Sequence, residues 1–183
     1  LHTSRRDAFK SVNALPVAKL TPQKVEFISK PKLRTGENPA LDVEHTDKVA
    51  LVKYFPGQNP DVLDFYSMTC KGIVIEAMGL GHLPTEEATN NWIPKVKRVI
   101  KEGRVICITS QCIHGRVDPY VYSAGRALEK TGAIFLDDML PETALVKLGW
   151  VLGHYGWKSK VREKMLTNFA GELNHRLVPE LGN

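Results

Sequence analysis

Four short apolar runs, separated by segments with helical spacing of apolar residues, constrain this chain more than any other feature. The runs span residues 49–55, 72–78, 104–110 and 133–136. Their length and β-branched content are typical of buried strands. Because strands that alternate with helices pair in parallel, the pattern predicts an α/β fold with a doubly wound, mainly parallel four-stranded sheet.

The segments between and after these runs predict the helices. Apolar residues recur at helical spacing in segments 85–103, 120–132 and 141–155, and the last of these places Tyr155 on its inner face and ends at Gly156. We expect Asp137 and Asp138 to help begin that helix. A final helix is predicted after an N-cap at Ser159, with Phe169 on its inner side.

The first part of the chain follows a different pattern. Residues 1–34 alternate short apolar pieces with prolines, and residues 24–28 alternate apolar and polar side chains as a half-buried strand does. That strand is expected to pair with the apolar piece near residue 16 in a hairpin. Pro31, Gly36 and Pro39 mark an extended linker, and the regular pattern begins only after Lys48.

Composition argues against a nucleic-acid-binding patch, a disulfide-rich secreted protein and a membrane-spanning protein. The 183 residues carry a formal charge of +5, with the basic residues scattered, and the densest basic patch, residues 95–101, is interpreted as a solvated helix face rather than a nucleic-acid site. Three cysteines without a C-x-x-C pair fit a reducing compartment. No apolar run approaches the ~20 residues that span a bilayer, so we expect a cytoplasmic protein without membrane contact.

Residues 106–115 place a hydroxyl (Ser110), a thiol (Cys112) and an imidazole (His114) at the end of a predicted strand. In open α/β sheets, this edge holds the ligands. A nucleophile needs a base held within reach, however, and no Gly-x-Ser-x-Gly turn is present. Cys112 and His114 also lack further ligands at metal-binding spacing. We therefore predict neither a nucleophile nor a metal site here.

A glycine-containing turn follows the second predicted strand. Gly79 and Gly81 suggest a dinucleotide fingerprint, but Pro84 stands where its last glycine belongs, so a turn that leaves the sheet is the favoured interpretation. His82 then projects near the ligand edge. It is interpreted either as a surface histidine or as a substrate contact.

Several motifs together resemble the L-asparaginase/glutaminase amidohydrolase family. They are GIVIEAMGLGH at 72–82, TSQC at 109–112, YSAGR at 122–126 and DMLPETALVKL at 138–148. Within that family, three further motifs resemble the D-type subunits of archaeal glutamyl-tRNA(Gln) amidotransferases. These are NNWIP at 90–94, HGRVDPYVY at 114–122 and MLTNFAGE at 165–172.

The resemblance implies two α/β domains in each protomer and a homodimer. Residues 1–34 would be the end of the N-terminal amidohydrolase domain, residues 35–47 a linker, and residues 48–183 the asparaginase-type C-terminal domain. The family uses a threonine nucleophile, a second threonine, an aspartate and a lysine. The resemblance places all four upstream of Leu1, and Thr3 and Thr21 match neither threonine motif. The chain, which does not begin with methionine, is thus expected to be a truncated protein that is inactive alone.

What the resemblance leaves in this chain is a supporting role. His82 stands where related asparaginases often have asparagine, and Ser110 and Gln111 follow on the next loop, so these three are the candidate substrate- or interface-proximal residues. No cofactor is expected in this chain.

The same resemblance implies a partner and an amide donor. Glutamine or asparagine would supply ammonia for conversion of Glu-tRNA(Gln) to Gln-tRNA(Gln). ATP and Mg²⁺ are expected at a tRNA-binding, E-type partner of the amidotransferase complex, with only indirect tRNA contact by this chain. The alternatives are a cytoplasmic type I L-asparaginase and a non-catalytic dimerisation or partner-docking module.

Overall fold

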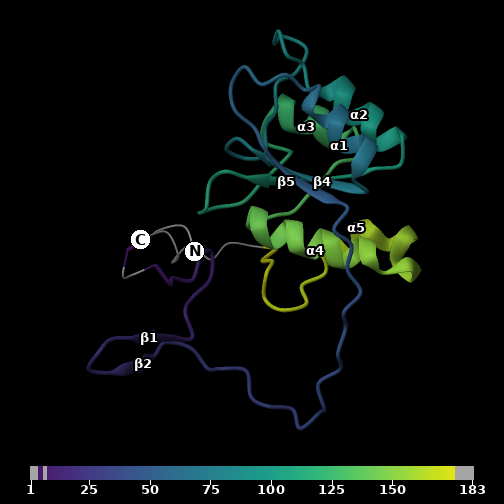
Figure 1. Ribbon diagram of the computed structural model, residues 1–183. Helices are drawn as coiled ribbons and strands as arrows, with labels where there is room; N and C mark the ends of the chain where they lie inside the picture. Colours follow the sequence, from purple (N-terminus) through teal and green to yellow (C-terminus); the bar gives the residue numbers. More distant parts are fainter. Residues whose placement is uncertain (1–3, 6–7, 176–183) are drawn as a thin grey trace. The chain divides into compact units, whose positions relative to one another are not determined.

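The structure is a computed structural model that describes residues 4–5 and 8–175. The described residues form two compact units, one within the chain up to Asp42 and one spanning Val43–His175 (Figure 1). The prediction about Thr3, and the outer ends of the predicted domains 1–34 and 48–183, lie outside the described residues. The predicted domain boundaries stay predictions.

The smaller unit contains an antiparallel hairpin. Strand β1 (Ala18–Leu20) pairs with β2 (Val25–Phe27), as the alternating pattern predicted. The turn is closed by a 2.9 Å hydrogen bond from the Thr21 amide to the Lys24 carbonyl. The half-buried character predicted for the second strand was wrong, because Val25 is 55% exposed and Phe27 is 69% exposed.

The larger unit is built on a four-stranded parallel sheet. Its strands are β3 (Val49–Lys53), β4 (Gly72–Ala77), β5 (Val105–Ser110) and β6 (Ile134–Phe135), in the order β3-β4-β5-β6. The predicted α/β class with a parallel four-stranded sheet and flanking helices is therefore confirmed. Ala77 and Ser110 are register partners, so β4 and β5 end side by side at the carboxyl edge of the sheet.

Helices cover both faces of this sheet (Figure 1). One face carries α1 (Val62–Thr69), α2 (Ile93–Lys101) and α3 (Ser123–Glu129), and the other carries α4 (Pro141–Gly153) and α5 (Val161–Leu166). The strands are ordered in the sheet as they are in the chain. Because connections between parallel strands share one handedness, the helices that connect them, α1, α2 and α3, all lie on the same face. The second layer comes from α4 and α5, which follow the last strand.

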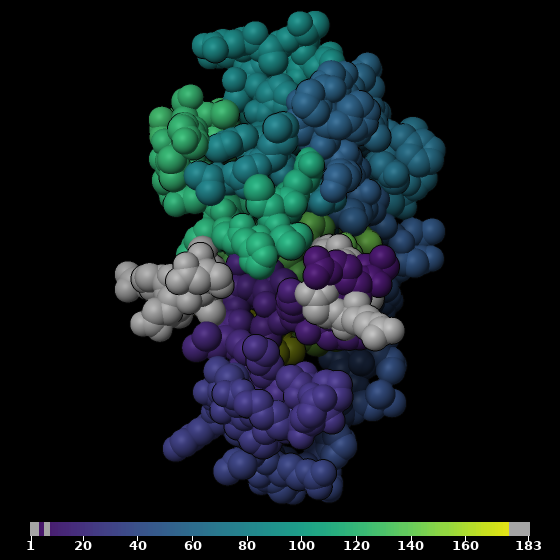
Figure 2. Space-filling model, turned by 90° about the vertical axis from the view of Figure 1, so that its left-hand side faces the viewer, coloured from purple at the N-terminus to yellow at the C-terminus, as the bar shows by residue number. Residues whose placement is uncertain are grey.

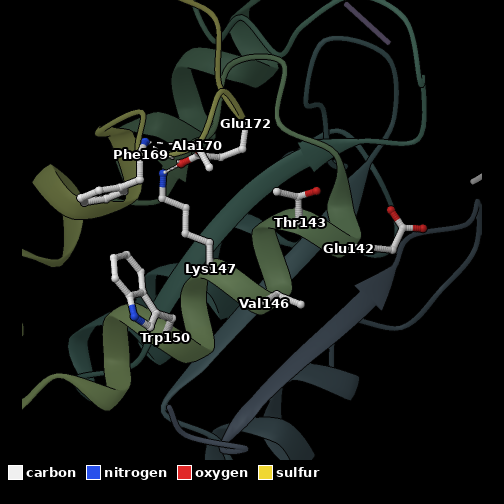
Figure 3. Close-up of a pocket in the computed structure, with 8 residues that line it drawn as sticks. All are labelled: Glu142, Thr143, Val146, Lys147, Trp150, Phe169, Ala170 and Glu172. Carbon is white, nitrogen blue, oxygen red and sulfur yellow. Dashed lines mark hydrogen bonds and ion pairs between the residues drawn. The ribbon is translucent and has the colours of Figure 1, made fainter. Parts of the chain in front are cut away.

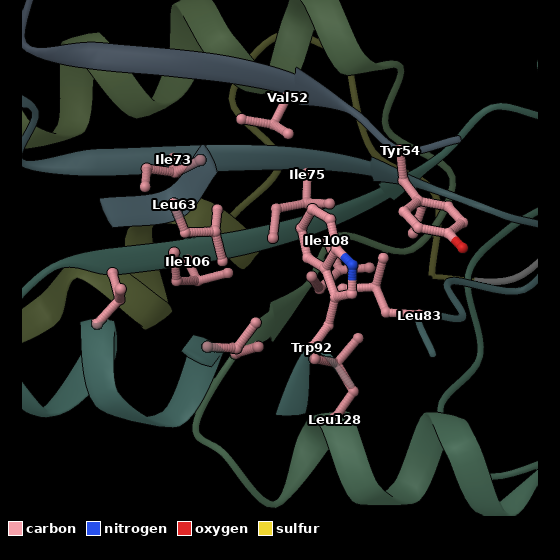
Figure 4. Close-up of a cluster of buried hydrophobic side chains, with 14 of the residues drawn as sticks. Val52, Tyr54, Leu63, Ile73, Ile75, Leu83, Trp92, Ile106, Ile108 and Leu128 are labelled. Carbon is pink, nitrogen blue, oxygen red and sulfur yellow. The ribbon is translucent and has the colours of Figure 1, made fainter. Parts of the chain in front are cut away.

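Two apolar cores result from the alternation of side chains along the strands. Ile73 and Ile75 of β4 face the first core, which surrounds the fully buried Trp92 (Figure 4). Val74, between them, faces the second core under α4. Cys107 also lies in the second core, where burial raises the pKa of its thiol to about 12.

Three helices are shorter than the sequence predicted. The helix expected over residues 85–103 spans only Ile93–Lys101. The helix expected over residues 120–132 begins only at Ser123, because the Asp118 carboxylate accepts a 2.9 Å hydrogen bond from the Tyr120 amide and holds a turn there. The helix expected over residues 141–155 ends at Gly153, since His154 has an extended backbone. Tyr155 is 81% exposed and does not lie on the inner face.

The predicted last helix also differs from the structure. A 3₁₀ helix, η1 (Tyr155–Lys160), contains both Gly156 and Ser159, so neither the predicted helix end nor the predicted N-cap is correct. Helix α5 begins at Val161 after Lys160, with no side-chain cap. Phe169 lies beyond the end of α5. The chain turns earlier than its apolar spacing suggested because Glu172 and Asn168 bond the backbone of residues 169–173 into a turn.

Residues 44–46, which we call the strap, lie along the carboxyl half of α4. The Thr46 amide donates a 3.0 Å hydrogen bond to the Gly149 carbonyl. A Cβ atom at Gly153 would lie only 2.5 Å from the His45 amide nitrogen and 2.6 Å from its Cα. The two helix glycines therefore allow the strap backbone to approach the helix closely.

Candidate functional site

The loop after β4 folds back on itself at the carboxyl edge of the sheet. The Met78 amide donates to the His82 carbonyl at 3.2 Å, and the His82 amide donates to the Met78 carbonyl at 2.9 Å. Gly81 has φ +94°, and a Cβ atom there would lie 2.8 Å from Phe135 Cε1. Only glycine fits both constraints. The interpretation of this segment as a turn that leaves the sheet is confirmed.

His82 carries an unusual polar atom at the end of this turn. Its Nε2 is buried and has no hydrogen-bond partner among the described residues. The ring packs edge-on against Tyr122, with centroids 5.1 Å apart. Burial lowers the pKa of His82 below its ordinary value, so the imidazole is neutral at neutral pH. A buried polar atom without a partner is rare in folded proteins, and this nitrogen can still form a hydrogen bond.

Ser110 is engaged in holding the neighbouring loop. Its hydroxyl donates a 2.5 Å hydrogen bond to the Gly79 carbonyl and accepts a 3.0 Å bond from the Cys112 amide. No histidine forms a hydrogen bond with this hydroxyl among the described residues. An unactivated hydroxyl that is used twice in this way is a structural tie rather than a nucleophile.

Gln111 joins the ends of three strands. Its backbone amide donates to the Ala77 carbonyl at 2.9 Å. Its side-chain Nε2 donates to the carbonyls of Tyr54, at 2.5 Å, and Glu76, at 3.2 Å. In the surface view of Figure 2, the green-teal segment that follows β5 lies on the outside of the larger unit. His82, Ser110 and Gln111 thus lie on two adjoining loops of one edge, with Ser110 and Gln111 supporting the turn that carries His82.

The other reactive side chains of this edge form no centre. Cys112 and His114 are exposed on the loop after β5. Within residues 4–5 and 8–175, no three His, Cys, Asp or Glu side chains gather as a metal site would require. In the same part of the chain, no helix has the length and apolar content needed to cross a membrane.

Asp137 and Asp138 do not begin α4, contrary to the prediction from sequence. Asp137 forms an ion pair with Arg116 and lies 3.3 Å from His175 Nδ1. Asp138 accepts two 2.7 Å hydrogen bonds from Asn174, one from its amide and one from its side chain. The two carboxylates instead fasten the end of the described chain to the carboxyl end of β6.

The sequence analysis did not predict a buried ion pair on the face of the sheet that α4 and α5 cover. Lys147 of α4 donates to Glu172 Oε1 and to the Thr167 carbonyl, each at 2.6 Å, with its side chain only 6% exposed (Figure 3). The pair lies beside an apolar groove of about 490 Å³ lined by Trp150 and Phe169. A signal was present, because Lys147 stands on the apolar stripe of α4 and a buried ammonium needs a carboxylate partner.

Both the sequence and the structure of this chain are similar to those of known proteins. Residues 48–165 match the family described as the glutaminase/asparaginase C-terminal domain. A relative from Pyrococcus abyssi, named as the D subunit of glutamyl-tRNA(Gln) amidotransferase, is 51% identical over 176 residues, which cover 94% of this chain and 39% of the relative. A protein of the same name from Sulfurisphaera tokodaii is 45% identical over 183 residues, which cover 98% of this chain and 40% of the relative. The chain thus spans about two fifths of the length of these relatives.

A solved structure supports the same assignment. The thermostable L-asparaginase from Thermococcus kodakarensis superposes with a TM-score of 0.81 at 32% identity, covering 91% of this chain and half of that protein. The resemblance seen in the motifs is confirmed by the family match, the curated relatives and this structure together. The chain belongs to the glutaminase/asparaginase C-terminal domain family.

Proposed function

We propose that this chain is the C-terminal part of a protein that releases ammonia from the side-chain amide of glutamine or asparagine. A tRNA-binding partner would use that ammonia, with ATP and Mg²⁺, to convert Glu-tRNA(Gln) to Gln-tRNA(Gln). The observation that carries the proposal is the 51% identity, over 94% of this chain, with the D subunit of a glutamyl-tRNA(Gln) amidotransferase. We further propose that the protein is a cytoplasmic homodimer.

His82 is the residue of this chain that we assign to the substrate. The buried Nε2 of a neutral imidazole can donate one hydrogen bond or accept one, depending on the tautomer. The side-chain amide of the amino-acid substrate offers both a donor and an acceptor, and its carboxylate offers acceptors. Its Nε2 atom has no partner among the described residues, which supports this role. Ser110 is a positioning residue, because it bonds the Gly79 carbonyl in the turn that carries His82. Gln111 ties down the strand end just before that turn, through the Glu76 and Ala77 carbonyls.

The covalent chemistry is assigned to residues outside this chain. A threonine hydroxyl would attack the amide carbon, ammonia would leave from the tetrahedral intermediate, and water would then hydrolyse the ester. The two hydroxyls at the end of β5 are poorly suited to that attack. Thr109 is 1% exposed and directs its hydroxyl toward the Ile75 carbonyl at 3.4 Å, while Ser110 is used as described above.

Ammonia release by two proteins tests this proposal. The 183-residue chain alone is expected to release no ammonia from glutamine or asparagine, whereas a longer protein that carries the upstream threonine motifs is expected to do so. In that longer protein, His82→Ala should raise KM more than it lowers kcat, since a binding contact is removed. Ammonia release by the chain alone would contradict the proposal.

An L-asparaginase is the second candidate, because the Thermococcus kodakarensis enzyme shares the fold at 32% identity. The two functions differ in their partner. An amidotransferase component should copurify with a tRNA-binding protein and support glutamine-dependent amidation of Glu-tRNA(Gln). An asparaginase should hydrolyse asparagine without a partner. A pure docking module would show neither activity, and its melting temperature would not change when glutamine or aspartate is added.

A further inference from the structure

Two clusters of basic residues in the larger unit differ in what lies beside their charges. In the first, on α2, Lys95 Nζ lies 2.7 Å from a carboxylate oxygen of Asp61 and 2.7 Å from one of Asp64, and Arg98 also pairs with Asp64. These pairs tie α2 to α1. Lys97 and Lys101 of this cluster are exposed, and its interpretation as a solvated helix face rather than a nucleic-acid patch stays a prediction.

The second cluster, which we call the basic corner, spans residues 155–164 in η1 and α5. Its cations are Lys158, Lys160, Arg162 and Lys164. Its only acidic residue is Glu163, which lies 3.6 Å from Lys164. Lys158 and Lys160 are exposed, and neither forms an ion pair with a described residue. Among the described residues, the charges of Lys158 and Lys160 are therefore not neutralised by a carboxylate.

Aromatic rings lie among these cations. Tyr155 is 81% exposed, and Lys158 Nζ lies 4.1 Å from the centre of its ring. Trp157 stacks on His154 with centroids 3.8 Å apart, and Lys164 Nζ lies 5.0 Å from the centre of the Trp157 ring. Exposed rings beside cations are what proteins use to bind single-stranded nucleic acid, where bases stack and phosphates pair.

The basic corner lies away from the candidate site. The carboxyl half of α4 lies over the beginning of β4, since a Cβ atom at Gly72 would be 2.7 Å from Leu152 Cδ1. The basic corner follows directly from that end of α4, whereas His82 lies at the carboxyl edge of the same sheet. A polymer bound at the basic corner would therefore leave the turn that carries His82 uncovered.

We propose that the basic corner binds the phosphate backbone of RNA directly, with Tyr155 as a stacking surface for an unpaired base. The identification of that RNA as tRNA rests on the proposed function, and direct contact goes beyond the indirect contact expected from sequence. An acidic protein would match the charge equally well but would make no use of the exposed Tyr155 ring. The observations therefore favour RNA.

Binding of a fluorescein-labelled tRNA(Gln) transcript tests this inference in the longer protein with its tRNA-binding partner. Lys158→Ala with Lys160→Ala should raise Kd at least fivefold at 0.1 M salt and lower the salt slope by roughly two, about one for each phosphate contact. Lys97→Ala with Lys101→Ala is the matched control. It removes the same charge from exposed positions on α2 and should change Kd less than twofold.

A photo-crosslink locates the contact independently of affinity. Benzoylphenylalanine in place of Tyr155 should crosslink the transcript, whereas the same group in place of Tyr120, also exposed but before α3, should not. An unchanged Kd in the Lys158/Lys160 variant together with no crosslink at Tyr155 would overturn the inference. So would equal loss of affinity in the control, or displacement of the RNA by polyglutamate at equal charge concentration.

The ammonia assay separates this inference from the proposed function. The Lys158/Lys160 variant should release ammonia at the wild-type rate. If the wild-type protein released none, the proposed function would fail, and the Kd values and crosslinks would still decide whether the basic corner binds RNA.

Discussion

The Ser110 hydroxyl and the Gly79 carbonyl are joined by a 2.5 Å hydrogen bond that links the loop after β5 to the loop after β4. The same hydroxyl accepts a bond from the Cys112 amide, so it fixes its own loop as well. His82 lies three residues after Gly79 on the turn that this bond supports. The hydroxyl of Ser110 thus ties its own loop to the turn that carries His82.

Ser110→Ala should destabilise the protein by about 1–2 kcal/mol, because it removes a donor and an acceptor from a site that is 8% exposed. Urea unfolding followed by circular dichroism measures this change. Ser159→Ala is the control, since that hydroxyl is exposed and makes no side-chain hydrogen bond with a described residue, and its effect should lie within ±0.5 kcal/mol. In the longer protein, Ser110→Ala should retain ammonia release. Abolished kcat with an unchanged fold would show that Ser110 is catalytic after all.

Much of the fold could be predicted because it depends on local pattern. The apolar runs that became β3–β6 had strand length and β-branched content, and the segments between them had helical spacing. The errors arose where distant contacts decide the backbone. The strap occupies the surface beside Gly153, where α4 ends, and Asp137 and Asp138 bind residues 174–175 rather than the helix start. Neither contact leaves a periodic signal in the sequence.

The candidate site was predictable in position but not in detail. Parallel strands bring their carboxyl ends to one edge, so the sequence placed His82, Ser110 and Gln111 together. That Gln111 bonds the carbonyls of two other strand ends depends on side-chain geometry. The buried, unpartnered Nε2 of His82 depends on packing around the turn. Sequence patterns carry neither kind of information.

Gly153→Ala should destabilise the protein by about 1–3 kcal/mol, even though alanine favours helix over glycine by nearly 1 kcal/mol. The added methyl group would overlap the His45 backbone at 2.5–2.6 Å and displace the strap. Thermal unfolding measures the change, and limited proteolysis within residues 43–47 reports release of the strap. Gly156→Ala is the matched control, because no atom lies within 4 Å of its Cβ position. Equal melting temperatures for the two variants would refute the close packing.

Glu172→Ala should cost about 3–5 kcal/mol, because it leaves the Lys147 ammonium, 6% exposed, without its carboxylate. A double-mutant cycle uses wild type, Lys147→Met, Glu172→Gln and the double variant. The double variant should lose less stability than the sum of the losses in the Lys147→Met and Glu172→Gln variants, since no unpaired charge is then left behind. Urea unfolding of the four proteins completes this cycle. Additive effects would show that the two side chains do not depend on each other.

The stability that Glu172 provides should depend on pH. Burial alone would raise the pKa of its carboxyl, but hydrogen bonds from Lys147 and from the amides of Ala170 and Phe169 lower it to about 2 from 4.5. A carboxyl whose pKa is lowered by folding stabilises fully above its unfolded pKa, and the contribution is lost as pH falls toward the folded pKa. The difference in unfolding free energy between wild type and Glu172→Gln should therefore not change between about pH 5.5 and about pH 7.5. It should then shrink between about pH 4.5 and about pH 2. Because both proteins share every other titrating group, a difference that stayed constant throughout the acid range would show that the Glu172 carboxylate contributes no such pH-dependent stability.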